Sequence, residues 1–169
     1  MDRMSSIELA MKNEQAEKQF YLEQAARTGN AVARTLFEAL AADEDEHKRR
    51  LAKLYETLKR DGAWPESVPL EVAGTDVRQR LEALSRGAAA SAHDDDDLAA
   101  LRKAEAFEAG GAELYAGLAK GCDNRQEARF FDFLAGIERE HLASVRDSIF
   151  YLEDPAGWTA AHERASLDG

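Results

Sequence analysis

Apolar residues recur at every third or fourth position along four long stretches of the chain, 5–28, 31–61, 94–121 and 124–154. This spacing is typical of one buried face of an α-helix. The second stretch buries Val32, Leu36, Phe37, Leu40, Leu51, Leu54 and Leu58 on such a face. The first stretch contributes Ile7, Met11, Tyr21, Leu22 and Ala25, and the fourth contributes Phe130, Phe131, Leu134, Ile137, Leu142, Val145, Ile149 and Leu152. The pattern predicts an all-α protein in which four long helices share a core.

Residues that favour helix ends separate these stretches. The predicted starts are the capping box Ser5-x-x-Glu8, Asn30, the aspartates at 94–97, and Asp123 or Asn124. The predicted stops are Gly29, Asp61-Gly62, Gly121, and Pro155 with Gly157. The four helices should therefore form two hairpins with short turns.

The segment between the hairpins is longer and less regular. Residues 62–93 contain prolines, glycines and an alanine run, and Thr75 can cap a short helix that carries Val77, Leu81 and Leu84. A helix of about 30 residues is about 45 Å long, and this segment is long enough to return along it. We therefore expect one domain, 1–169, made of a hairpin 5–61, a crossover 62–93, a hairpin 94–154 and a tail 155–169, with the second and third helices parallel. The tail should be short, docked or frayed, with Trp158 packed on the bundle or on a partner subunit.

Acidic residues and histidines interrupt the apolar faces at repeated positions. Residues 37–47 align with residues 131–141 at an offset of 94, with Phe, Leu, Ala, Glu, Glu and His identical. Each segment ends in Glu-x-x-His, a spacing that puts both side chains on one helix face. The same offset relates Glu14 to Glu108 and Tyr21 to Tyr115. The chain therefore contains an internal repeat of two halves. The repeat carries six candidate metal ligands: Glu14, Glu44, His47, Glu108, Glu138 and His141.

Helix geometry predicts that these six side chains meet. In each hairpin the two glutamates lie about 15 residues, or roughly 22 Å of helix, from the turn that joins their helices. The paired glutamates should thus be level with each other in the core. Four buried carboxylates would repel one another and take up protons, whereas two divalent cations would balance their charge. The alternative is that each Glu is a member of a buried ion pair and each His an ordinary core residue. By helical phase, Glu46 and Glu140 should point outward.

Composition excludes several classes of protein. The net charge of −11 argues against a nucleic-acid partner, and the sequence has no apolar run of membrane-spanning length and no signal-peptide pattern. We therefore expect a cytoplasmic protein that does not bind membranes. Cys122 is the only cysteine, which rules out an internal disulfide and a cysteine-ligated metal site. His93 beside the aspartates is a second, weaker candidate for a metal ligand, with helix capping as the alternative.

Residues 13–21 and the two Glu-x-x-His segments resemble the rubrerythrin branch of the ferritin-like superfamily, and the likeness covers nearly the whole chain. The resemblance implies a ferritin-like four-helix bundle, usually paired as a homodimer, that holds two iron ions, with manganese as an alternative. It implies Glu14, Glu44 and His47 around one metal, Glu108, Glu138 and His141 around the other, and Glu44 and Glu138 as bridges. Tyr21 and Tyr115 would lie a turn or two away as candidate catalytic residues.

The chain departs from that family in two respects. Full-length rubrerythrins add a small cysteine-ligated iron domain, which one cysteine cannot build. They also carry a further Glu one turn after the ligand of the third helix, where this chain has Gly111. Glu17 holds the corresponding position in the first helix, as a seventh carboxylate or as surface charge. Glu105 could compete with Glu108, although the repeat favours Glu108.

These observations leave two classes of function open. The first is redox chemistry at a di-iron centre with hydrogen peroxide or dioxygen as oxidant. It would act either as a peroxidase with an external electron donor or as a ferroxidase that takes ferrous iron as substrate, and a dimanganese catalase is a variant. The second is a metal-stabilised bundle that stores iron or binds a partner without turnover. A cage-forming ferritin is disfavoured on the expectation that no fifth helix of useful length follows Pro155.

Overall fold

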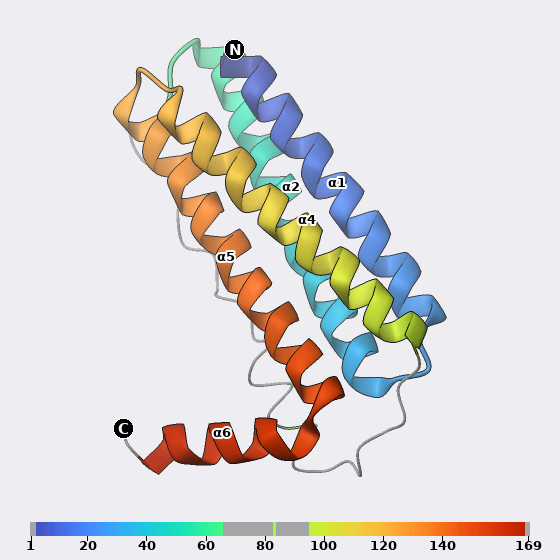
Figure 1. Ribbon diagram of the computed structural model, residues 1–169. Coiled ribbons are helices and arrows are strands. Elements are labelled where there is room, and N and C mark those ends of the chain that lie inside the picture. Colours follow the sequence, from blue (N-terminus) through green and yellow to red (C-terminus); the bar gives the residue numbers. More distant parts are fainter. Residues whose placement is uncertain (1–2, 66–82, 84–94, 168–169) are drawn as a thin grey trace.

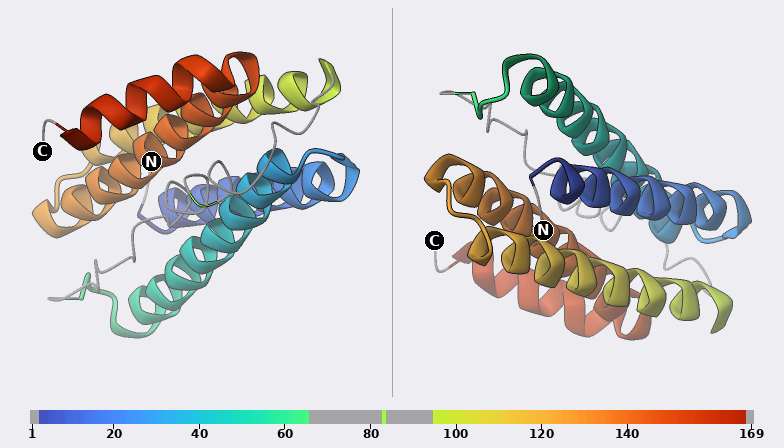
Figure 2. Two further views of the ribbon diagram at one scale, coloured as in Figure 1. Left: turned by 90° about the horizontal axis from the view of Figure 1, so that it is seen from below. Right: turned by 90° about the horizontal axis from the view of Figure 1, so that it is seen from above.

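The computed structural model describes residues 3–65, 83 and 95–167, with side chains described up to residue 161. Its helices are α1 (Arg3–Arg27), α2 (Ala31–Asp61), α4 (Asp95–Lys120), α5 (Arg125–Glu153) and α6 (Pro155–Leu167). α1 packs mainly on α2 and α4 mainly on α5, which gives two antiparallel hairpins stacked as a four-helix bundle (Figures 1 and 2). The predicted all-α, ferritin-like fold is confirmed.

The two hairpins are oriented as a long crossover requires. The turn between α1 and α2 lies at the same end of the bundle as the start of α4 (Figure 1). There the Thr28 hydroxyl donates a hydrogen bond to the Asp97 carboxylate, a buried contact between the hairpins. α2 and α4 therefore run parallel. The predicted short helix that begins at Thr75 and the role of His93 lie outside the described residues.

Local chemistry explains most of the helix ends. The side chains of Asn30 and Asn124 each accept hydrogen bonds from two backbone N–H groups in the first turns of α2 and α5. Gly62 follows α2 with a φ of 66°, a left-handed conformation that glycine adopts without strain. The predicted helix start at Ser5 is wrong, because α1 already runs from Arg3. The Glu8 carboxylate accepts a hydrogen bond from the Tyr55 hydroxyl on α2 at 2.6 Å.

The expectation that no useful helix follows Pro155 is also wrong. α6 is a 13-residue helix that crosses the end of the bundle (Figure 1). Asp154 ends α5 and accepts a hydrogen bond from the Gly157 N–H at 2.9 Å, while Pro155 occupies the first helical position, where a missing N–H costs nothing. Trp158 is buried and packs edge-on against Tyr151 of α5. Because a fifth helix is present, a cage-forming ferritin is no longer disfavoured on that ground.

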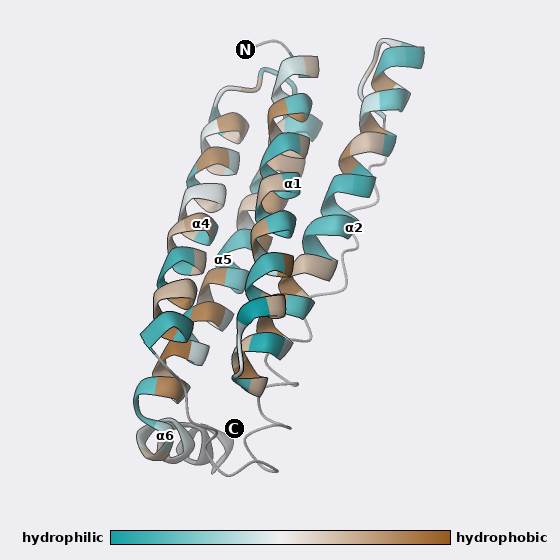
Figure 3. Ribbon diagram, turned by 90° about the vertical axis from the view of Figure 1, so that its right-hand side faces the viewer, coloured by the Kyte–Doolittle hydropathy of each residue, from teal (hydrophilic) through white to brown (hydrophobic). Residues whose placement is uncertain are grey.

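The apolar core is divided in two by a polar layer. Along each of the four bundle helices, buried apolar residues lie on both sides of a buried charged segment, and they form two separate clusters. The cluster near the α1–α2 turn contains Leu36, Phe37 and Leu101, and the other contains Leu51, Leu54 and Phe131. Polar and apolar residues accordingly share each helix (Figure 3).

Three apolar residues depart from the predicted faces. Leu22 is exposed on α1, and Met11 on α1 and Leu142 on α5 are only half-buried. None of the helices that the structure describes is long and apolar enough to cross a membrane.

Candidate metal centre

The polar layer is made by the six residues that the repeat singled out. One Glu comes from each of α1 and α4, and a Glu-x-x-His pair comes from each of α2 and α5. All six side chains are at most 1% exposed: Glu14, Glu44, His47, Glu108, Glu138 and His141. Their candidate ligand atoms form two sets, each with all of its atoms within 4.8 Å of one another. The sets are Glu14, Glu44, His47, Glu138 and Glu44, Glu108, Glu138, His141.

Glu44 and Glu138 belong to both sets, and Glu44 shows how one side chain can serve two positions. Its Oε2 atom lies 3.0 Å from His47 Nδ1, and its Oε1 atom lies 3.1 Å from His141 Nδ1. The two imidazole rings are stacked with their centroids 5.6 Å apart. Both histidines thus turn Nδ1 toward the carboxylates, on opposite sides of Glu44.

Each half of the layer has its own terminal carboxylate. His47 Nδ1 lies 3.0 Å from Glu14 Oε2, and His141 Nδ1 lies 3.3 Å from Glu108 Oε2. The structure therefore brings together all six residues that the repeat singled out, with Glu14 and His47 in one set and Glu108 and His141 in the other.

The hydrogen bonding of the layer fits a bound cation. Both carboxylate oxygens of Glu138 are buried and have no hydrogen-bond partner among the described residues. Glu44 Oε1 and Glu108 Oε2 lie 3.1 and 3.3 Å from His141 Nδ1 but make no hydrogen bond to it. Buried polar atoms in proteins are nearly always paired, and here the unpaired ones face one another in one place. Carboxylate oxygens with one imidazole per set suit iron or manganese.

Burial and mutual repulsion shift the pKa values of these groups in the metal-free protein. Burial, and next the charge of Glu44, raise the pKa of Glu14 to about 8 and that of Glu138 well above its ordinary value. Burial also opposes ionisation of Glu44, but the two histidines outweigh it and lower its pKa. Burial disfavours the charged form of His47, yet its hydrogen bonds to Glu14 and Glu44 raise its pKa to about 9. Without metal the layer therefore holds protons that a cation would replace.

Both tyrosines contact the candidate ligands directly. The Tyr21 hydroxyl on α1 donates to Glu108 on α4, and the Tyr115 hydroxyl on α4 donates to Glu14 on α1. Burial, and next the charges of Glu108 and Glu14 respectively, raise both tyrosine pKa values well above 10. The hydroxyls therefore stay protonated and act as donors between the hairpins.

Glu17 is not a surface charge. Its side chain is 1% exposed, its Oε2 atom has no partner among the described residues, and burial raises its pKa to about 10. It belongs to neither of the four-residue sets. At the matching position, a Cβ atom on Gly111 would lie 3.1 Å from Glu138 Oε2, so the carboxylate of Glu138 occupies the space beside that glycine.

Three other acidic residues lie away from the layer. Glu46 is one-third exposed and pairs with Arg49 and Arg50, and Glu140 is exposed. Glu105 pairs with Arg102 and Arg146 at the surface, so it does not compete with Glu108.

One residue of the site was missed by sequence reasoning. Asp43 Oδ2 lies 3.6 Å from His141 Nε2, the ring nitrogen that faces away from the carboxylates. Asp43 directly precedes Glu44, and a helix turns 100° per residue. That phase alone does not show that its side chain reaches across to α5.

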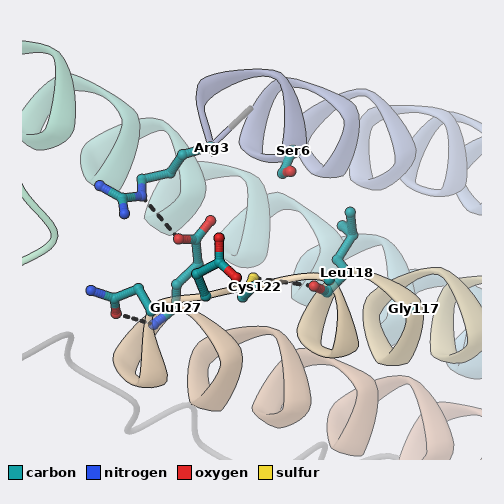
Figure 4. A pocket seen from close by; sticks show the side chains of 9 residues that line it. Arg3, Ser6, Gly117, Leu118, Cys122 and Glu127 are labelled. Atoms are coloured by element: carbon teal, nitrogen blue, oxygen red, sulfur yellow. Dashed lines mark hydrogen bonds and ion pairs between the residues drawn. The ribbon is translucent and has the colours of Figure 1, made fainter. Parts of the chain in front are cut away.

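A separate hollow lies beside the α4–α5 turn (Figure 4). It has a volume of about 310 Å³ and is lined by Arg3, Ser6, Gly117, Leu118, Gly121, Cys122, Asp123, Asn124 and Glu127. The Cys122 thiol donates to the Leu118 carbonyl at 3.1 Å, and burial raises its pKa to about 11. This cysteine is therefore a protonated thiol and contributes nothing to the polar layer.

A helical bundle with two repeat-related carboxylate and histidine sets at its centre has the architecture of the ferritin-like proteins. The chain belongs to the rubrerythrin family, because the model of that family, described as Rubrerythrin, matches residues 6–149. Comparisons with curated proteins and with solved structures give no match.

Proposed function

We propose that this chain is a di-iron carboxylate protein that uses hydrogen peroxide or dioxygen as its oxidant. One observation carries the proposal: two sets of buried ligand atoms share Glu44 and Glu138. Shared carboxylates hold two metals close together, which suits the transfer of two electrons to one oxidant. Membership in the rubrerythrin family supports this reading.

The six buried residues would bind the two metals, and the two tyrosines would orient them. Glu14 and His47 would hold one metal, Glu108 and His141 the other, and Glu44 and Glu138 would bridge them. Iron bound in this way would supply electrons by cycling between its divalent and trivalent states. Tyr21 and Tyr115 would hold the terminal carboxylates in place through their hydroxyl groups, while the apolar clusters on both sides exclude water.

We further propose Glu17 as a seventh carboxylate of the site. It is buried, and its main electrostatic neighbours are Glu44 and Glu108. Glu17→Gln should weaken binding of one of the two metals, whereas Glu23→Gln, on the exposed side of α1, should leave both unchanged. Equal affinities in the two variants would remove Glu17 from the ligand set.

Two reactions fit this site. Reduction of hydrogen peroxide to water takes two electrons and two protons. The single cysteine among residues 1–169 cannot build a cysteine-ligated iron domain, so the electrons would come from a donor outside these residues. Ferroxidase activity requires no such donor, because ferrous iron is both substrate and electron source. The electron donor, the homodimer and the cytoplasmic location stay predictions.

The oxidant can be identified by loading the metal-free protein with Fe²⁺ under anaerobic conditions and adding peroxide or air in parallel. Ferric absorption that rises fast with peroxide and slowly with air supports the peroxidase reaction, and a fast rise with air supports the ferroxidase reaction. Iron that binds but is oxidised by neither would contradict the proposal and leave a metal-stabilised reservoir or interaction protein. Release of dioxygen from peroxide only after Mn²⁺ loading would identify a dimanganese catalase.

A further inference from the structure

The internal repeat is broken beside one of the two histidines. Asp43 precedes Glu44 in the first half, and the position 94 residues later, before Glu138, is Ile137. The six candidate ligands all obey the repeat, whereas this neighbouring position does not. The two halves of the metal site therefore have different surroundings.

The two halves also differ in what lies near Nε2 of each histidine, the ring nitrogen that faces away from the four buried glutamates. Asp43 Oδ2 lies 3.6 Å from His141 Nε2, slightly beyond hydrogen-bond length and within ion-pair distance. The Asp43 side chain is 29% exposed, so it has room for the small movement that closes this gap. Nε2 of both histidines is buried without a hydrogen-bond partner among the described residues, but only His141 Nε2 has a described carboxylate within ion-pair distance. The repeat counterpart of Asp43, Ile137, has no acceptor atom to offer to His47.

A carboxylate at the outer nitrogen affects how a histidine binds metal. It holds the ring proton at Nε2, which leaves the Nδ1 lone pair free to face the carboxylates, and it fixes the orientation of the ring. Loss of such a partner typically weakens metal binding 10- to 100-fold. Among the described residues, no carboxylate lies within ion-pair distance of His47 Nε2 to do the same there.

We propose that Asp43 is a positioning residue that makes the His141 half of the centre the tighter of two unequal metal sites. The first divalent cation then binds at Glu108 and His141, and the second at Glu14 and His47. This inference rests on the proposed metal site and adds an order of filling that the repeat alone does not predict.

Anaerobic titration of the metal-free protein with Co²⁺, followed by calorimetry and by cobalt absorption, measures the order directly. We expect two resolved binding steps. His141→Ala should remove the tighter step and His47→Ala the weaker one. Asp43→Ile, which copies the other half of the repeat, should weaken the tighter step about 10-fold or more. Asp43→Asn, which keeps an acceptor atom but loses the charge, should weaken it less.

Two further variants separate positioning from a general effect on the fold. Asp45→Asn removes a carboxylate that pairs with Lys18 and Arg49 at the surface of the same helix, and it should leave both steps unchanged. In a His141→Ala background, Asp43→Ile should have no further effect on Co²⁺ binding, because the imidazole through which Asp43 acts is absent. Circular dichroism of each metal-free variant confirms that the helices are intact.

Each remaining result overturns the inference in a distinguishable way. Two equal steps in the unmodified protein, or a loss in Asp43→Ile that falls on the step removed by His47→Ala, would contradict the order of filling while leaving the proposed function intact. Equal affinities in Asp43→Ile and Asp45→Asn would show that Asp43 has no positioning role. No binding of Co²⁺ at all would contradict the metal site itself and the inference with it.

Discussion

At the scale of single residues, the centre depends on how each carboxylate oxygen is used. Glu44 turns one oxygen toward each histidine, and each terminal carboxylate, Glu14 or Glu108, accepts a hydrogen bond from a tyrosine of the other hairpin. Each terminal carboxylate thus has one oxygen toward a tyrosine and the other toward a histidine. This division keeps both terminal ligands aimed at the middle of the layer.

Replacing Tyr21 with Phe should destabilise the metal-free protein by about 1–3 kcal/mol, the usual penalty when a buried polar group loses its partner. The atom that loses its hydrogen-bond donor is Glu108 Oε1. Tyr55→Phe is the matched control, because its hydroxyl donates to Glu8 at the surface, and it should change stability by well under about 1 kcal/mol. Urea unfolding of both variants measures the difference. Equal losses would mean that the buried hydrogen bond contributes nothing.

The identities of the site residues were predictable from the sequence, but some of their contacts were not. The offset of 94 residues located all six candidate ligands because helical phase and spacing are fixed by the backbone. The direct contact of Tyr21 with Glu108 and the reach of Asp43 to His141 depend on side-chain rotamers and on the distance between helices. Burial of Glu17 could not be decided for the same reason.

At the scale of helices, Gly111 on α4 leaves room for the Glu138 carboxylate of α5. Gly111→Ala should place a Cβ atom 3.1 Å from Glu138 Oε2. This contact would force a carboxylate that both ligand sets share to shift, and it should weaken metal binding. Gly110→Ala is the matched control, since a Cβ atom there meets nothing within 4 Å. It should stabilise the protein by about 0.5–1 kcal/mol through helix propensity. Co²⁺ titration and urea unfolding test both, and unchanged affinity in Gly111→Ala would contradict the assigned position of Glu138.

The errors made at this scale share one physical cause. Ser5 and Pro155 are residues that favour helix ends, but the sequence does not say on which side of them the helix lies. Pro155 fits the first turn of a new helix as well as the end of an old one, and the Asp154 cap decided between them. Asn30 and Asn124 were predictable because both positions lie between two strongly periodic segments.

At the scale of the whole molecule, the buried charges should make the stability of the metal-free protein depend on pH. Folding raises the pKa of Glu14 from 4.5 to about 8 and that of His47 from 6.5 to about 9. Each group stabilises the fold fully below its unfolded pKa, and this contribution is lost as pH rises through the folded pKa. The free energy of unfolding should thus fall most steeply between about pH 6.5 and 8. Glu44, with its lowered pKa, loses its contribution only in acid, below this range.

Thermal melting at pH 6 and pH 8.5 measures this effect, first with a chelator and then with Mn²⁺. The metal-free midpoint should fall at the higher pH. The difference between loaded and metal-free midpoints should grow, because metal binding releases the protons that the layer holds. In the metal-free protein, Glu14→Gln should reduce the change in melting midpoint between pH 6 and pH 8.5. A metal-free midpoint that rises with pH would contradict the raised pKa values.

Counting bound iron in four single variants tests the central claim, two metals bridged by Glu44 and Glu138, most directly. Glu44→Gln and Glu138→Gln each remove a charge shared by both ligand sets, so a colorimetric assay should find well below two irons per chain and no oxidation by peroxide or air. Glu46→Gln and Glu140→Gln change neighbouring residues that lie outside the layer, and both should keep about two irons and their oxidation. Similar losses in all four variants, or two irons retained in Glu44→Gln and Glu138→Gln, would contradict a buried bridged centre.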